Sequence, residues 1–242
     1  LVDEVVKPAQ FADHIRTRAA ALAATSDRPA DAKGVALVPI QRTIEADALL
    51  YRHVTVEIDR AKRTATFTVS APVGEQPATV AQIEAAAAAW WPLEMARELD
   101  DAILSMRTNE LDIGIWLLKT AGDAAAVLAT DAVLVAHADH WFVRETIGLL
   151  RRTLSRLDVS SRSLFALVEP GSCFAGTMLE LALACDRTYM LALPDDPDRA
   201  PKLSMSEANF AFYPMGTGQT RLARRFHDEA PAIDAVRARI GE

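Results

Sequence analysis

The chain has 242 residues, of which 50% are hydrophobic and 24% are charged, a composition typical of globular proteins. This length suffices for one large domain or two small ones. The net charge of -7 argues against nucleic-acid partners, because it would repel phosphate groups. No apolar run approaches the roughly 20 residues that a membrane-spanning helix needs, so we expect no membrane partner.

The N-terminal part predicts one helix followed by an irregular connector. Residues 9–24 carry helix-forming residues, and the polar run 25–28 then interrupts them, with Pro29 and Pro39 following. The chain begins at Leu1 instead of Met and stops just after a helical pattern. We therefore expect it to be a fragment of a longer protein.

From residue 51 onwards, strand and helix patterns alternate. Apolar residues with a period of two over 54–58 and 65–69 predict a β-hairpin, and a helix that begins near Val80 should restart at Pro92. Short apolar runs predict further strands, and longer amphipathic runs predict helices. The strands are expected at 112–118, 163–168, 188–193 and, as a fourth candidate, 202–205, and the helices at 141–157, 178–185 and 219–227. This order predicts an α/β domain with a mainly parallel sheet.

The segment 164–186 is the most informative for chemistry. A buried strand leads through a turn of small residues into an apolar helix that carries Glu180 near its start. Backbone N–H groups at a helix N-terminus lack partners and carry a positive partial charge, so they can stabilise a developing oxyanion. An acid near a helix start can equally serve only to complement the helix dipole. The residues alone leave both interpretations open.

Two motifs carry a family resemblance. Residues 180–186, Glu-Leu-Ala-Leu-Ala-Cys-Asp, and the block 203–222 resemble the signatures of the crotonase (enoyl-CoA hydratase/isomerase) superfamily, in the same order and at a suitable spacing. The resemblance implies an α/β fold of the crotonase-like (ClpP/crotonase) type, a spiral of ββα units, here truncated at its C-terminus. It also implies a crotonase-like catalytic domain over residues 51–242, preceded by an N-terminal helix and linker over residues 1–50.

The same resemblance implies roles for particular residues. Glu180 and Glu207 fall on the two acid/base glutamates of the superfamily, and the backbone N–H groups of Thr177 and Leu128 fall on its oxyanion hole. The chain departs from the pattern at three points: one extra residue precedes Glu180, Thr177 replaces a glycine, and the expected glycine near Leu128 is missing. Coenzyme A is expected only as part of the substrate, with no further cofactor.

Three further segments, 118–126, 137–146 and 169–177, resemble ring-opening lyases of this superfamily that act on aromatic acyl-CoA thioesters. Such enzymes convert 2,3-epoxybenzoyl-CoA to an aliphatic semialdehyde CoA ester and formate during aerobic benzoate degradation, and they dimerise. We therefore expect an aromatic acyl-CoA substrate and a homodimer. Two alternatives remain: a generic enoyl-CoA hydratase or isomerase that uses the same glutamates, and a non-catalytic module that binds acyl-CoA.

The cysteines and histidines predict no disulfide framework and no metal site. Cys173 and Cys185 lie in one apolar stretch, where two buried free thiols in a reducing cytoplasm are expected. His137 and His140 lie three residues apart, but no third ligand at metal-binding spacing accompanies them.

Overall fold

The computed structural model describes residues 2–27, 29, 31–227 and 229–240. The chain divides into two compact units, Leu1–Val35 and Ala36–Glu242. The first unit contains α1 (Pro8–Ala24), in agreement with the helix predicted over 9–24. The division falls earlier than the boundary expected at residue 50, because residues 43–50 pair with the sheet of the second unit.

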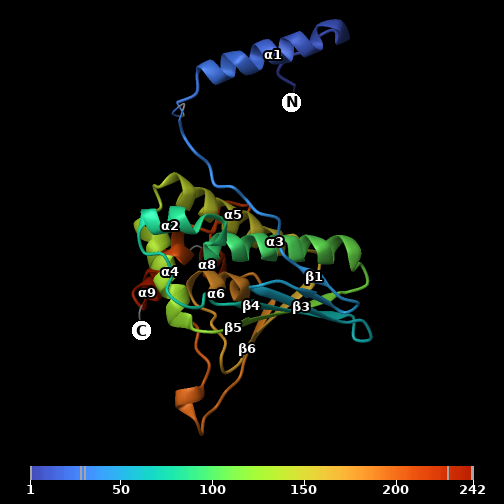
Figure 1. The fold of residues 1–242 in the computed structure, drawn as a ribbon. Helices are drawn as coiled ribbons and strands as arrows, with labels where there is room; N and C mark the ends of the chain where they lie inside the picture. Colours follow the sequence, from blue (N-terminus) through green and yellow to red (C-terminus); the bar gives the residue numbers. More distant parts are fainter. Residues whose placement is uncertain (1, 28, 30, 228, 241–242) are drawn as a thin grey trace. The chain divides into compact units, whose positions relative to one another are not determined.

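A seven-stranded sheet, with its strands in sequence order, organises the second unit (Figure 1). Pairing is antiparallel from β1 to β4 and parallel from β4 to β7, so the sheet is mixed instead of mainly parallel. The α/β class predicted from the sequence is confirmed. The strands are β1 (Thr43–Ile44), β2 (Ala48–Leu50), β3 (Val54–Asp59), β4 (Thr64–Ser70), β5 (Ile115–Ala121), β6 (Ser163–Val168) and β7 (Arg187–Met190).

Helices follow or separate the strands of this unit. As predicted, Pro92 lies in the first turn of a new helix, where its missing N–H has no bond to lose. The α-helices are α2 (Val80–Ala86), α3 (Trp91–Asn109), α4 (Ala124–Ala136), α5 (Trp141–Asp158), α6 (Gly176–Leu183), α7 (Ala208–Ala211), α8 (Arg221–Arg225) and α9 (Ala230–Arg237). Two short 3₁₀ helices, η1 (Ala87–Ala89) and η2 (Pro197–Arg199), complete the described elements.

One face of the sheet carries the core. Alternate residues of β3 to β6 are buried, and α3 and α5 lie on one side of the strands in Figure 1. Phe67 and Trp116 pack with their ring centroids 4.8 Å apart. Burial of such large side chains is the main stabilising contribution to a fold of this size. The core fixes the end of β6, and therefore the start of α6, which is where the sequence predicts a site.

Several element predictions need correction. Residues 202–205 form no strand; Ser204 makes only an isolated parallel bridge with Ala175. The strand expected over 112–118 begins later, at Ile115, and the helix expected over 219–227 is limited to Arg221–Arg225. The helix α4 had no counterpart among the predicted elements. Cys173 and Cys185 are free and buried, which confirms the expectation for the two thiols.

Candidate active site

The start of α6 lies against α4 with no room for a side chain between them. Gly176, the first residue of α6, has a φ of +45°. A Cβ atom at Gly176 would lie 1.9 Å from Oδ2 of Asp131 and 3.0 Å from Oγ of Ser206. Glycine is therefore the residue that this position requires, both for the backbone conformation and for the close approach.

Asp131 of α4 is fully buried and accepts hydrogen bonds from neutral donors. Its Oδ2 accepts from the Thr177 N–H at 2.7 Å and from the Ser206 hydroxyl at 2.6 Å. The Thr177 hydroxyl donates to Oδ1 and also contacts the Tyr213 hydroxyl at 2.7 Å. Burial raises the pKa of Asp131 from 3.8 to about 6, although the hydrogen bonds from Ser206 and Thr177 oppose this rise.

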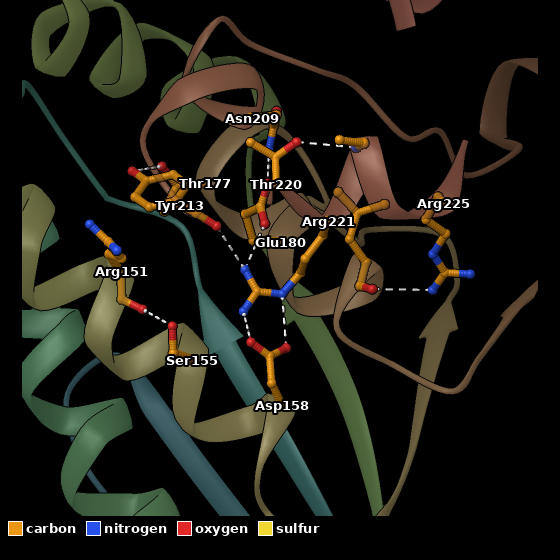
Figure 2. Close-up of polar contacts among 12 residues, drawn as sticks. Arg151, Ser155, Asp158, Thr177, Glu180, Asn209, Tyr213, Thr220, Arg221 and Arg225 are labelled. Carbon is orange, nitrogen blue, oxygen red and sulfur yellow. Dashed lines mark hydrogen bonds and ion pairs between the residues drawn. The ribbon is translucent and has the colours of Figure 1, made fainter. Parts of the chain in front are cut away.

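Glu180 is also fully buried, one turn further along α6, and both of its oxygens are bound by protein groups (Figure 2). Asn209 donates to Oε1 at 2.7 Å, and Nη1 of Arg221 lies 3.0 Å from Oε2. The same guanidinium binds Asp158 through two bonds of 3.2 and 2.7 Å. Burial raises the pKa of Glu180, whereas the charge of Arg221 and the hydrogen bond from Asn209 lower it.

Asn209 and Ser206 join the surroundings of Glu180 to those of Asp131. The Asn209 amide donates to the Gly176 carbonyl at 2.8 Å, and its oxygen accepts the Ser206 N–H at 3.0 Å. Because the Ser206 hydroxyl donates to Asp131, one buried polar network connects α4, α6, α7 and α8. Networks whose polar groups are all satisfied hold their members in a single arrangement.

An apolar groove of about 410 Å³ lies beside this network. Its polar groups come from Asp131, Ser206 and Glu207. Glu207 is exposed, and its Oε2 accepts from Nε of Arg237 at 3.0 Å. The groove is lined by Leu128, Asp131, Ala132, Val135 and Ala136 of α4, by Met205, Ser206 and Glu207, and by Ile240.

The predicted site residues lie partly in the buried polar network and partly in the apolar groove. Thr177 and Glu180 belong to the buried network, whereas Leu128 and Glu207 line the groove. The Thr177 N–H is already bound to Asp131. Leu128 lies inside α4, where the carbonyl four residues earlier takes its N–H. The structure therefore offers neither N–H group to a ligand, and the two glutamates do not face one another across a common pocket.

Sequence reasoning missed several residues of the network, among them Asp131, Ser206, Asn209 and Arg221. Asp131 is the acid of an otherwise apolar, alanine-rich run, and that was the available signal. A lone acid amid small apolar residues indicates a buried and hydrogen-bonded carboxyl. Arg221 is followed by Arg224 and Arg225, a pattern that favours an exposed basic helix face, but Arg221 is buried.

The histidines predicted to lie outside any metal site make contacts with protein groups. His137 is 3.3 Å from the Ala78 carbonyl, and His140 lies 3.4 Å from Glu84. Within 2–27, 29, 31–227 and 229–240, no group of three or more His, Cys, Asp or Glu side chains could hold a metal ion.

None of the helices described in those ranges is long and apolar enough to cross a membrane.

One known protein is similar to the chain along its whole length. No protein-family model matches the chain. A curated protein of Aromatoleum evansii, benzoyl-CoA-dihydrodiol lyase, is 56% identical over 241 residues, which is 100% of this chain. The chain is homologous to benzoyl-CoA-dihydrodiol lyase. The 56% identity confirms the resemblance to ring-opening lyases that the sequence motifs indicated. The chain spans 43% of the length of that lyase.

Similar solved structures come from the enoyl-CoA hydratases and isomerases. An enoyl-CoA hydratase of Geobacillus kaustophilus is 19% identical, with a TM-score of 0.43, and the match covers 77% of this chain and 59% of that chain. The Bacillus anthracis enoyl-CoA hydratase is 17% identical, with a TM-score of 0.42 and coverage of 72% and 58%. The human mitochondrial delta3-delta2-enoyl-CoA isomerase is 14% identical, with a TM-score of 0.40 and coverage of 66% and 54%.

Proposed function

We propose that this chain is part of a ring-opening lyase that converts 2,3-epoxybenzoyl-CoA to an aliphatic semialdehyde CoA ester and formate, in aerobic benzoate degradation. The observation that carries the proposal is the 56% identity to benzoyl-CoA-dihydrodiol lyase along the whole chain. In this proposal the second unit, Ala36–Glu242, acts as the catalytic domain, and the first unit, which contains α1, acts as an N-terminal helix and linker.

The apolar groove beside α4 is the proposed site for the ring of the substrate. Its walls are mostly alanine, leucine, valine, methionine and isoleucine side chains, which suit a ring carbon skeleton, and its volume is about 410 Å³. The polar side chains that reach the lining are Ser206 and Glu207, whereas the carboxyl of Asp131 is fully buried. A ring that carries an oxygen atom therefore finds both apolar contact and hydrogen-bonding groups there.

The two glutamates take different parts in this proposal. Glu207 is accessible and lines the groove, so it is the proposed acid/base group that contacts the substrate. Glu180 is bound to Arg221 and Asn209 and acts as a positioning residue. Through Asn209 it fixes the Gly176 carbonyl and the Ser206 N–H, and therefore the floor of the groove.

The reaction is proposed to need no cofactor besides the coenzyme A of the substrate. Opening of an oxygenated ring by water and release of formate require proton transfers and bond cleavage, which carboxyl and hydroxyl groups can assist. A homodimer in the cytoplasm is part of the same proposal, supported by the resemblance to dimeric lyases and by two free, buried cysteines, Cys173 and Cys185.

The test is incubation of the protein that carries this chain with 2,3-epoxybenzoyl-CoA, followed by measurement of formate. Stoichiometric release of formate supports the lyase. Hydration of crotonyl-CoA without formate release from the epoxide would instead favour a generic hydratase. If neither substrate turns over but both CoA esters raise the melting temperature, a non-catalytic acyl-CoA-binding module is favoured.

A further inference from the structure

The Ser206 hydroxyl lies between the groove and the buried carboxyl of Asp131. It donates to Oδ2 of Asp131 at 2.6 Å and accepts the N–H of Ala208 at 3.3 Å. A serine oxygen can accept two hydrogen bonds, so one acceptor position is left. Ser206 lines the groove and keeps 9% of its surface exposed. A water molecule or hydroxyl group in the groove can therefore donate to Ser206 while Ser206 donates to Asp131.

Within the described part of the chain, no cation pairs with the Asp131 carboxylate. Among the ion pairs of the described residues, none includes Asp131, and its donors are one backbone N–H and two hydroxyls. The titratable groups around it are Tyr213 behind Thr177, Glu180 one turn further along α6, and Glu207 in the groove. The nearby arginines, Arg221 and Arg237, pair with those two glutamates and not with Asp131. A buried charge without a counter-ion is costly, so uptake of a proton relieves the site.

We propose that Ser206 and Asp131 form a proton relay that deprotonates the water attacking a substrate in the groove; this rests on the proposed lyase function. The proton of the water passes to Oγ of Ser206 as the hydroxyl proton of Ser206 passes to Oδ2 of Asp131. One water O–H bond and one serine O–H bond break, and one serine O–H bond and one carboxyl O–H bond form. The nascent hydroxide attacks the substrate, and Asp131 becomes a neutral acid.

The relay supplies a second acid/base group that the groove otherwise lacks. Ring opening by water needs one group that takes a proton and one that gives a proton, and these groups must face the same substrate. Glu180 is turned into the network, with both of its oxygens bound by Asn209 and Arg221. Glu207 and Ser206 both line the groove, so Glu207 remains free to contact the substrate as the second acid/base group while the relay activates water. The raised pKa of Asp131, about 6, suits a group that exchanges protons near neutrality.

If Ser206 and Asp131 only supported the fold, their variants would give different kinetics from those of a proton relay. The variants are therefore chosen to separate a relay from a structural role. The test measures kcat and KM for formate release by the intact protein, from about pH 5 to about pH 8. Ser206→Ala, Asp131→Asn and the double variant are compared with two controls. Ser155→Ala removes an exposed hydroxyl that donates to the Arg151 carbonyl, and Glu98→Gln removes a buried carboxyl outside the groove.

The relay predicts that Ser206→Ala and Asp131→Asn each lower kcat by about 100-fold or more, with a small change in KM. The double variant should lose no more than either single variant, because both changes interrupt one path. The wild-type rate should fall below about pH 6, and this acid limb should disappear in both variants. Both controls should keep the wild-type kcat and pH profile.

Each other outcome contradicts a specific statement. Wild-type protein that releases no formate contradicts the proposed function, and the relay with it. Formate release that survives in Ser206→Ala at the wild-type rate, or losses that add in the double variant, contradict the relay and leave the proposed function standing. If Asp131→Asn does not fold, the Ser206→Ala rate and pH profile alone decide.

Discussion

The guanidinium of Arg221 holds the carboxylate of Glu180 in the interior, with Nη1 3.0 Å from Oε2 and the two side chains 2% and 1% exposed. Asp158 binds the other edge of the same guanidinium. The ion pair is thus part of a triad of one cation and two carboxylates, in which Arg221 and Glu180 are buried and the Asp158 side chain is 20% exposed. Removal of the single cation leaves the buried Glu180 carboxylate without its counter-ion, which is far more costly than the loss of a surface pair.

Substitution Arg221→Met is therefore expected to lower the free energy of unfolding by about 3–5 kcal/mol. Denaturant unfolding monitored by circular dichroism measures this loss. The matched control is Arg237→Gln, which removes an exposed partner of Glu207 and should cost less than about 1 kcal/mol. Equal losses in the two variants would show that the buried pair of Arg221 and Glu180 contributes no more to stability than the exposed pair of Arg237 and Glu207.

Gly176 gives a second stability prediction. An alanine at this position would place its Cβ 1.9 Å from the Asp131 carboxylate in a backbone conformation with φ at +45°, so we expect Gly176→Ala to destabilise by about 2 kcal/mol or more. A Cβ atom added at Gly148, inside α5, would have no atom within 4 Å, and Gly148→Ala should stabilise by up to about 1 kcal/mol. Thermal unfolding measures whether Gly176→Ala lowers the melting temperature and Gly148→Ala raises it.

The pH dependence of stability should carry the signature of Asp131. Its pKa is about 6 in the folded protein, above the ordinary value of 3.8, so the folded state binds the proton more tightly. The resulting stabilisation is fully present below about pH 4 and is lost as the pH rises through about 6. Between about pH 7 and pH 5 the wild type should gain about 1 kcal/mol relative to Asp131→Asn.

Glu180, Asp158 and Glu98 also have raised pKa values because they are buried, but they titrate in both proteins of that comparison. The difference between wild type and Asp131→Asn therefore isolates Asp131. Urea unfolding at the two pH values provides the measurement, and an equal pH response in the two proteins would contradict the raised pKa.

Glu207 should matter for turnover and little for stability. Because its side chain is exposed and forms a surface ion pair with Arg237, Glu207→Gln should change the free energy of unfolding by less than about 1 kcal/mol. Loss of the proposed acid/base carboxyl should lower kcat by about 100-fold or more. Glu145→Gln removes another exposed acid, on α5, and serves as the control. A Glu207→Gln protein with the kcat of that control would exclude this role.

The sequence predicted the parts of the fold whose pattern is local. The hairpin of β3 and β4, the restart of the helix at Pro92 and the strand before α6 all follow from periodicity within short windows. Helix α4 was missed because its residues are apolar on most sides and rich in alanine, which leaves no clear 3.6-residue period. As a result, the Leu128 N–H was expected to be an oxyanion-hole donor, whereas it lies inside a helix.

The candidate site was predictable only in part, because its contacts join distant segments. The motif match identified Glu180 and Thr177, but the partner of Thr177, Asp131, lies 46 residues away. Ser206 reaches Asp131 across 75 residues, and Arg221 reaches Glu180 across 41. No spacing pattern in one sequence encodes such pairs, so the binding of the Thr177 N–H by an internal carboxylate appeared only in the structure.

Formate release from 2,3-epoxybenzoyl-CoA, measured side by side for wild type, Glu207→Gln and Glu145→Gln, tests the central claim most directly. We predict stoichiometric formate from the wild type and the Glu145→Gln control, and a loss of about 100-fold or more in Glu207→Gln. Wild-type protein that binds the CoA ester but yields no formate would contradict the assignment of a ring-opening lyase.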